Sequence, residues 1–173
     1  EGVLALIEHT CTEGVVVSIG HTDATSSQIE DAIRAGATMS THLGNGAHQE
    51  LRRFPNYIWD QLAADDLYAS FIVDGIHLPP DFVKVAVRAK GLNRTILVTD
   101  AVTPAGCTPG IYRFGPLDVE LLPENRVQLV TTGRLAGSTL RMDRAIENLL
   151  RFSGLSLLEA LRTVTVNPGK ALH

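Results

Sequence analysis

Several features that mark particular classes of protein are scarce or missing in this sequence. Only 2 cysteines occur in 173 residues, Cys11 and Cys107, and they form no C-x-x-C pair. This excludes a disulfide framework and favours a reducing compartment, so we expect a cytoplasmic protein. No apolar run approaches the roughly 20 residues that span a bilayer, which argues against a membrane segment. With 15 Lys+Arg, 19 Asp+Glu and no run of five like charges, nothing predicts nucleic-acid binding.

The composition is that of an ordinary globular domain. Hydrophobic residues make up 45% of the chain, which is enough to fill a core, and 173 residues suit one domain. The N-terminus lacks an initiator Met, and it lacks the basic segment and apolar stretch of a secretory signal. We therefore expect one domain over residues 1–173 that is a piece of a longer protein.

One pattern recurs along the first hundred residues: a short β-branched strand, a polar or Gly-containing turn, and an amphipathic helix closed by glycine. The predicted elements are strands at residues 15–19, 37–41, 68–73 and 95–98 and helices at residues 25–36 and 79–91. The first strand is apolar throughout, as in parallel strands that are buried on both faces. Residues 44–60 are too rich in Gly, Asn, Pro and charge for a regular element, and a loop of that length suggests function.

The pattern changes in the second part of the chain. Between residues 110 and 137, apolar and polar residues alternate, which predicts a β-hairpin inserted after the fourth strand. A helix with Ser138 as its N-cap is expected next. The last helix begins at a capping box formed by Ser156 and Glu159, and it is expected to stop near Pro168.

Four strand–loop–helix units in sequence predict a parallel α/β arrangement. A (β/α)8 barrel needs about 250 residues, so four units make half of one. A small doubly wound sheet is the alternative, but no G-x-G-x-x-G follows the first strand. We therefore expect an α/β fold that is half of a (β/α)8 TIM-type barrel with an inserted β-hairpin.

Three histidines and one aspartate occupy equivalent places in the repeated units. Each lies within four residues after the apolar run of a different predicted strand: His21, His42, His77 and Asp100. In a barrel such positions meet at the C-terminal face, where barrel active sites lie. One strand-end histidine is usually structural, but the repetition points to function. Two histidines and a carboxylate are typical of an open hydrolytic zinc site.

Five motifs around these residues occur in a recognisable order. They are GHTDAT from Gly20, THLxN from Thr41, DGIH from Asp74, VTDA from Val98 and LAGS from Leu135. Over nearly the whole chain they resemble the N-acetylglucosamine-6-phosphate deacetylase family of the amidohydrolase superfamily. The resemblance implies the C-terminal half of the catalytic barrel. It also implies metal-dependent hydrolysis of N-acetylglucosamine 6-phosphate, which gives glucosamine 6-phosphate and acetate.

The resemblance further implies a role for each strand-end residue. His21 and His42 would bind a divalent metal, usually zinc, with iron as the alternative. His77 would contact the substrate amide or the sugar hydroxyls, and Asp100 would act first as general base and then as general acid. An acetamide is a poor electrophile and a sugar amine a poor leaving group, so the reaction needs an activated water and a proton carrier. Asp23 either caps the following helix or supports His21.

The loop after the second histidine carries the implied phosphate contacts. Asn45 and Gly46 would offer an amide and backbone N–H groups to the sugar phosphate. One of Arg52 or Arg53, for which we choose Arg53, would add a charged fork. In the family this arginine reaches across the interface of a homodimer. A solvated pair of arginines on a loop is an equally good interpretation from the sequence alone.

The sequence departs from the family pattern in two places. The family holds its metal with a further glutamate from a Glu-Gly-Pro motif, which does not occur here. Residues 44–49 read Gly-Asn-Gly-Ala-His-Gln, where better-known members carry Asn-Ala-Met after the ligand. Two histidines without the carboxylate bind metal weakly, so we expect this chain alone to be inactive or nearly so. The alternatives are an amidohydrolase for another N-acyl substrate and a non-catalytic binding or assembly module.

Overall fold

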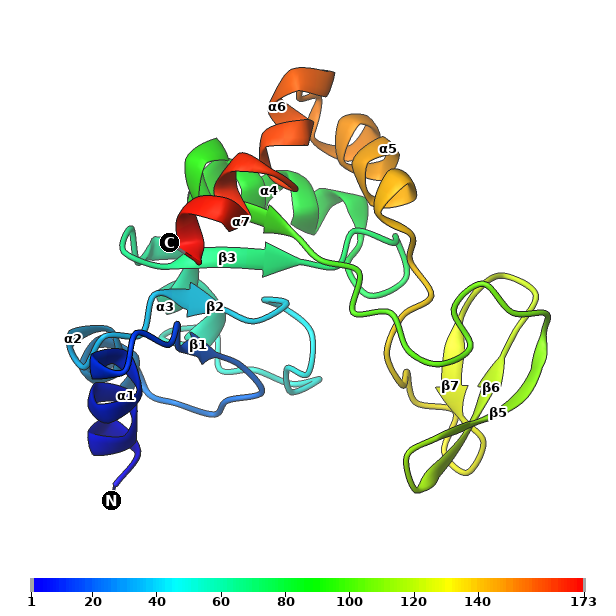
Figure 1. The fold of residues 1–173 in the computed structure, drawn as a ribbon, viewed down its shortest axis with the longest axis horizontal. Helices are drawn as coiled ribbons and strands as arrows, with labels where there is room; N and C mark the ends of the chain where they lie inside the picture. The colour runs from blue at the N-terminus through cyan, green and yellow to red at the C-terminus, as the bar shows by residue number, and fades with distance from the viewer. Residues whose placement is uncertain (1, 173) are drawn as a thin grey trace.

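A computed structural model describes residues 2–172 of the chain, and its main part is a sheet of four parallel strands. In spatial order they are β1 (Ser18–Ile19), β2 (Met39–Ser40), β3 (Tyr68–Phe71) and β4 (Thr95–Leu97). The four arrowheads in Figure 1 point the same way, so the carboxyl ends of the strands lie along one edge of the sheet. The predicted parallel α/β arrangement is therefore confirmed.

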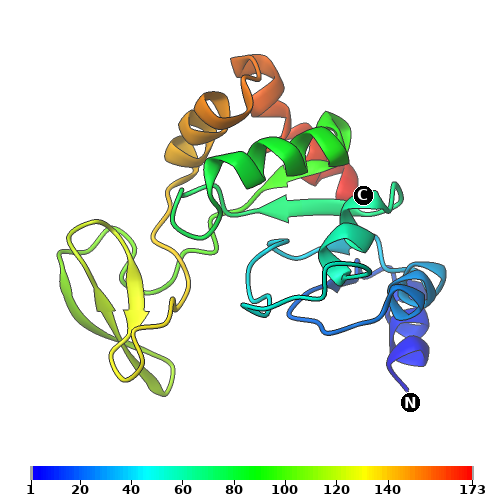
Figure 2. The ribbon, with the colours of Figure 1, turned by 180° about the vertical axis from the view of Figure 1, so that it is seen from behind.

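Helices alternate with these strands and then follow them. They are α1 (Val3–Thr12), α2 (Ser26–Arg34), α3 (Tyr57–Ala63), α4 (Pro80–Lys90), α5 (Met142–Ser153), α6 (Leu157–Arg162) and α7 (Val166–Ala171), with a 3-10 turn at Leu92–Arg94. Figures 1 and 2 show α4, α5 and α6 on one side of β3 and β4. The main core lies there, and it contains Phe71, Leu97, Val83 and Leu149, all almost fully buried.

A second, antiparallel sheet is inserted between β4 and α5. Its strands are β5 (Gly110–Phe114), β6 (Leu117–Leu121) and β7 (Val127–Leu129), which pair in that order. The sequence predicted a hairpin here, and β6 and β7 confirm it. The first strand of the insert, β5, was missed because none of its residues is fully buried, so it carries no clear alternation of apolar and polar residues. The insert has its own small core around Val119, Leu121 and Val127.

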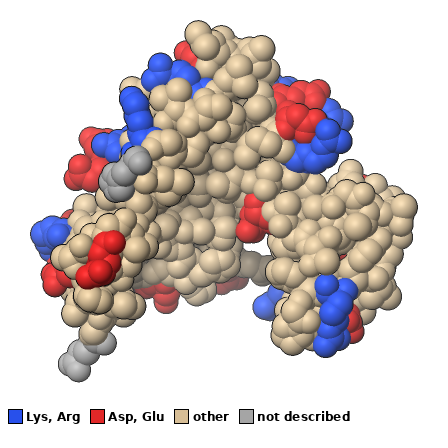
Figure 3. All heavy atoms as spheres, viewed as in Figure 1, with Lys and Arg blue, Asp and Glu red and all other residues tan. Residues whose placement is uncertain are grey.

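The insert stands apart from the parallel sheet, on the side toward which the four strands point (Figure 1). A notch separates the two parts in the space-filling view of Figure 3. On the face shown there, basic and acidic side chains are interspersed among a mostly uncharged surface. Among the described residues, no helix is both long and apolar enough to cross a membrane.

The first predicted strand is shorter and more exposed than the sequence indicated. Only Ser18 and Ile19 form β1, and Val15 is 54% exposed rather than buried on both faces. The reason is position, because β1 is an edge strand that pairs with β2 alone. The apolar pattern of residues 15–19 describes a strand with two neighbours, but within the described chain this strand has one.

Three other element predictions are wrong in their boundaries. Residues 44–60 are not irregular throughout, because Asn56 caps α3 by accepting hydrogen bonds from the N–H groups of Ile58 and Trp59. Helix α5 begins at Met142 and not at residue 138. The last helix does not run on to Pro168, since α6 ends at Arg162 and the proline lies in the first turn of α7, where its missing N–H costs nothing.

Asn167 ties α7 to the sheet and offers a test of this packing. Its side chain is 1% exposed, and its Nδ2 donates to the carbonyls of Leu92 and Thr95 at 2.7 Å each. Asn167→Ala leaves both carbonyls without their donor, so we expect a loss of about 3 kcal/mol in the free energy of unfolding. Urea unfolding measures it. Asn93→Ala, which removes an exposed side chain bonded only to Arg162, should cost under about 0.5 kcal/mol. Equal losses in the two variants would contradict the assignment.

Candidate active site

The structure places all four predicted strand-end residues at the same edge of the parallel sheet. His21 and His42 each follow their strand by two residues, Asp100 follows β4 by three, and His77 lies in the longer loop between β3 and α4. Because the strands are parallel, these loops emerge on one side of the sheet. The predicted convergence at the carboxyl ends of the strands is therefore confirmed as an arrangement of loops.

Backbone strain marks three of these residues. Within residues 2–172, four residues other than glycine have positive φ: His21 (45°), His42 (28°), Asp100 (50°) and Asn125 (63°). Asn125 sits in the turn between β6 and β7, where such a φ is ordinary for asparagine. Histidine and aspartate adopt this region at a cost, and residues held in it cluster at functional sites. Sequence periodicity carries no signal for this strain.

His21 and His42 bring their imidazoles together. Their Nε2 atoms are 3.0 Å apart, and their ring planes meet at 84°. Two nitrogens bound tetrahedrally to one zinc ion lie about 3.3 Å apart, since each Zn–N bond is about 2.0–2.1 Å. His42 is buried, and its N–H donates to Ser70 Oγ at 2.7 Å, which fixes its backbone. The pair therefore fits two ligands of one metal ion.

The donor set is incomplete within the described part of the chain. Residues 2–172 contain no group of three or more His, Cys, Asp or Glu side chains arranged to hold a metal ion. Nδ1 of His42 is buried and has no hydrogen-bond partner among the same residues. Histidine ligands normally donate this second nitrogen's proton to a carboxylate or carbonyl. The two imidazoles fit a metal, but they do not complete its coordination.

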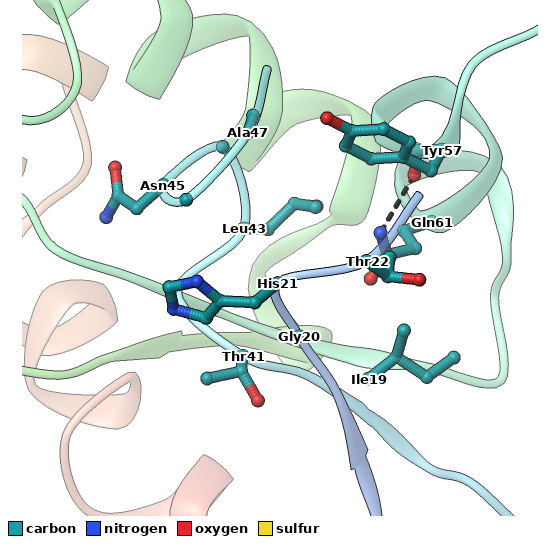
Figure 4. A pocket seen from close by; sticks show the side chains of 12 residues that line it. Ile19, Gly20, His21, Thr22, Thr41, Leu43, Asn45, Ala47, Tyr57 and Gln61 are labelled. Carbon is teal, nitrogen blue, oxygen red and sulfur yellow. Dashed lines mark hydrogen bonds between the residues drawn. The ribbon is translucent and has the colours of Figure 1, made fainter. Parts of the chain in front are cut away.

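The loop that follows His42 packs directly on His21. In Figure 4 the imidazole of His21 points toward the loop with Asn45 and Ala47 and away from Tyr57. A Cβ atom on Gly46, which has φ +63°, would lie 2.5 Å from His21 Nδ1, so only glycine allows this approach without movement of the ring. Nδ2 of Asn45 is buried without a hydrogen-bond partner in the described chain, and it is free to donate to a ligand.

His77 is paired with an aspartate to which the sequence assigned no role. Nδ1 of His77 lies 2.6 Å from Oδ2 of Asp74, and both side chains are about nine-tenths buried. Oδ1 of Asp74 accepts the N–H groups of Ile76 and His77, each at 2.8 Å. Burial acts to raise the pKa of the Asp74 carboxyl, but the hydrogen bonds from the His77 side chain and these N–H groups outweigh it, so the pKa lies below its ordinary value. The signal in the sequence was the Asp-x-x-His spacing.

Asp100 is held by the segment that returns from the insert. Its carbonyl accepts the N–H of Ser138 at 3.1 Å, and the carbonyl of Ser138 accepts the N–H of Val102 at 2.9 Å. Gly137 makes this approach possible, because a Cβ there would come within 2.3 Å of Val102. The sequence predicted Ser138 as the N-cap of the helix, and this prediction is wrong, because the N-cap of α5 is Arg141. Ser138 instead pairs with the backbone around Asp100. The Asp100 side chain is exposed.

Three loop residues are less fixed. Arg52 and Arg53 are exposed, and their carbonyls accept from Asn56 Nδ2, while their side chains make no ion pair within residues 2–172. Asp23 does not cap α2, since Thr25 forms that cap with Gln28. The Asp23 side chain is 85% exposed and makes no hydrogen bond to His21 in the described chain.

Known deacetylases of amino sugar phosphates are similar to this chain in sequence. No protein-family model matches the sequence. The N-acetylglucosamine-6-phosphate deacetylase of Bacillus subtilis is 36% identical over 96% of this chain and 42% of its own length. The N-acetylgalactosamine-6-phosphate deacetylase of Shewanella is 32% identical, with the same two shares covered.

Solved structures agree with the sequences. A variant of the N-acetyl-D-glucosamine-6-phosphate deacetylase of Mycobacterium smegmatis, in complex with N-acetyl-D-glucosamine-6-phosphate, superposes with a TM-score of 0.93 and 35% identity. The match covers 99% of this chain and 46% of that one. The Thermotoga maritima N-acetylglucosamine-6-phosphate deacetylase gives 0.90 and 30%, over 98% of this chain and 46% of that one.

The chain is thus similar, in sequence and in fold, to amidohydrolases that act on N-acetylated amino sugar phosphates. Within this class, the resemblance to N-acetylglucosamine-6-phosphate deacetylase is confirmed over nearly the whole chain. The chain spans about 42–46% of the length of these relatives.

Proposed function

We propose that the protein carrying this chain hydrolyses the N-acetyl group of N-acetylglucosamine 6-phosphate to give glucosamine 6-phosphate and acetate. The observation that carries the proposal is the His21–His42 pair, whose Nε2 atoms meet at 3.0 Å on the edge of the sheet where Asp100 also lies. A pair of converging imidazoles supplies part of the donor set of a hydrolytic metal site. Proteins that are similar to this chain in sequence and in structure are named as deacetylases of this substrate.

We propose that His21 and His42 hold a divalent metal together with a ligand from outside residues 2–172. Zinc is the metal that we propose, and iron is the alternative. When bound, the metal supplies a Lewis acid and an activated water for attack on the acetyl carbonyl. The residues of this chain fix the geometry around it. Ser70 Oγ accepts the backbone N–H of His42 and so fixes the backbone that carries this ligand, and the Gly46 loop packs against the ring of His21 and restricts its movement.

Asp100 would carry the proton in this reaction. Its carboxylate makes no hydrogen bond or ion pair within residues 2–172, so its oxygens are available to a water and then to the departing amine nitrogen. The backbone bond to Ser138 sets where the carboxylate stands while its side chain stays exposed. One group that takes a proton and returns it satisfies both halves of amide hydrolysis.

The sugar phosphate would lie against the loop after His42. Asn45 offers an unpaired Nδ2 and Gly46 an exposed backbone, which supports their assignment as phosphate contacts. Arg53 projects from the same loop without a partner in the described chain, and we propose that it reaches the phosphate bound to a second copy in a homodimer. His77 would contact the sugar or its amide.

The larger frame of this site also stays a proposal. We expect the four parallel strands to be the C-terminal half of a (β/α)8 barrel that forms one hydrolase domain over residues 1–173, in the cytoplasm. The exposed outer side of β1, next to an open apolar hollow lined by α1 and α2, supports a further strand neighbour there.

The direct test is release of acetate by the purified product of the full gene, loaded with zinc. N-acetylglucosamine 6-phosphate should be turned over, and its unphosphorylated form much more slowly. N-acetylgalactosamine 6-phosphate must be assayed in parallel, because relatives with that substrate are 31–32% identical to this chain. A higher kcat/KM for N-acetylgalactosamine 6-phosphate would show that it, and not the proposed substrate, is preferred. Absence of acetate release from both compounds would show that the proposed activity is wrong.

Residues 1–173 by themselves are expected to be inactive or nearly so. The reason is the missing third ligand among residues 2–172, without which two histidines bind metal weakly. The measurement is acetate release by the isolated chain in excess zinc, with the full gene product as the positive control. Metal-dependent turnover of about 1 s⁻¹ or more, an ordinary enzymatic rate, would show that this expectation is wrong.

A further inference from the structure

Asp74 and His77 form a buried pair that the roles proposed so far do not use as a unit. The Nδ1–Oδ2 distance of 2.6 Å is that of a hydrogen bond to an ionised group. A carboxylate can only accept, so Nδ1 of His77 carries the proton that is donated to Asp74. The lowered pKa of Asp74 agrees with an ionised carboxylate here.

The loop that carries the pair is anchored on both sides. Oδ1 of Asp74 closes a tight turn by accepting the N–H groups of Ile76 and His77. Just before it, the carbonyl of the fully buried Val73 accepts from Asn148 Nδ2 of α5 at 2.9 Å. The two oxygens of Asp74 thus do different work, since one shapes the loop and the other holds the ring.

The other ring nitrogen of His77, Nε2, is available to a ligand. Within residues 2–172, Nε2 makes no hydrogen bond, although every other side-chain nitrogen and oxygen of the pair is satisfied. In a neutral imidazole with the proton on Nδ1, Nε2 bears only a lone pair. It can accept a hydrogen bond from a hydroxyl or an amide N–H, but it cannot donate one to a carbonyl or phosphate oxygen.

We infer that Asp74 is a positioning residue that locks His77 in the Nδ1–H tautomer, so that Nε2 receives a hydrogen-bond donor of the substrate. On the amino sugar, the donors are the ring hydroxyls and the acetamide N–H. The inference rests on the proposed function for the identity of the substrate, but the tautomer of His77 does not depend on activity. It also leaves polarisation of the acetyl carbonyl to other groups.

The decisive variant is Asp74→Asn. Its Oδ1 can still accept both backbone N–H groups, so the turn is kept, while an NH₂ group replaces Oδ2 beside His77. This NH₂ donates to Nδ1 and moves the ring proton to Nε2, which turns an acceptor into a donor. We expect kcat/KM of the zinc-loaded full gene product to fall about 10–100-fold, the effect of removing a supporting partner of a functional histidine. Bound metal should not change.

Nitrogen-15 NMR of the imidazoles measures the tautomer directly. The signals of His77 are assigned as those that disappear in the His77→Gln variant. Neutral His77 with the proton on Nδ1 in the wild type and on Nε2 in Asp74→Asn supports the inference. A wild-type Nε2–H tautomer, or a doubly protonated ring at the pH of the assay, overturns it even if the enzyme is active. Asp143→Asn, in an exposed carboxylate at the start of α5, is the matched control and should leave kcat/KM unchanged. If no substrate is hydrolysed by the wild type, the proposed function fails while the NMR result still decides the role of Asp74.

Discussion

Asp100→Asn should lower kcat for acetate release by about 10³-fold, within the range that a positioned general acid–base contributes. The amide has nearly the same shape as the carboxylate, but it cannot take a proton from water or return one to the leaving nitrogen. Asparagine also tolerates the φ of 50° at this position better than alanine, so the backbone bond to Ser138 should persist. The measurement is steady-state hydrolysis of N-acetylglucosamine 6-phosphate by the zinc-loaded full gene product.

Two readouts separate lost chemistry from lost structure. Metal content and KM should stay close to those of the wild type, because Asp100 is proposed to move a proton and not to hold the substrate. Asp118→Asn, which neutralises an exposed carboxylate of β6 in an ion pair with Arg113, is the matched control and should keep full activity. A variant at position 100 that retained more than about a tenth of the wild-type kcat would remove Asp100 from the proton-transfer role.

The position of the candidate site was predictable from the sequence because it depends on a repeated pattern. Polar residues after successive β-branched runs must gather at one edge when the strands are parallel, whatever the detailed packing. His21, His42 and Asp100 obey this rule in the structure. A helix start set by local chemistry was also predictable, as the capping box at Ser156 demonstrates.

What the sequence could not reveal depends on contacts between distant segments. Two backbone hydrogen bonds join Ser138 to Asp100 and Val102, which precede it by more than 30 residues, and no local pattern predicts this contact. The approach of Gly46 to His21 also joins segments that no local pattern connects. Val15 was expected in the core because its residue type is apolar, but its burial depends on a neighbour that β1 does not have within the described chain.

His42→Asn should abolish stable metal binding. Asparagine tolerates the φ of 28° at this position, so the backbone should be kept. The substitution removes the Nε2 atom that lies beside Nε2 of His21. Loss of an outer partner of a ligand already costs 10–100-fold in metal affinity, so loss of the ligand itself should cost at least about 100-fold. His21→Asn should have the same effect. Zinc content after dialysis against a chelator series, with the full gene product, measures both.

The two histidines should also behave as one unit. If a single ion bridges them, the double variant should lose little more zinc affinity and activity than either single variant, because one substitution already removes the site. His9→Asn, at an exposed histidine in the last turn of α1, is the matched control and should keep the wild-type affinity. Independent, additive losses from His21 and His42 would mean that their 3.0 Å approach reflects packing, and the metal would have to be held elsewhere.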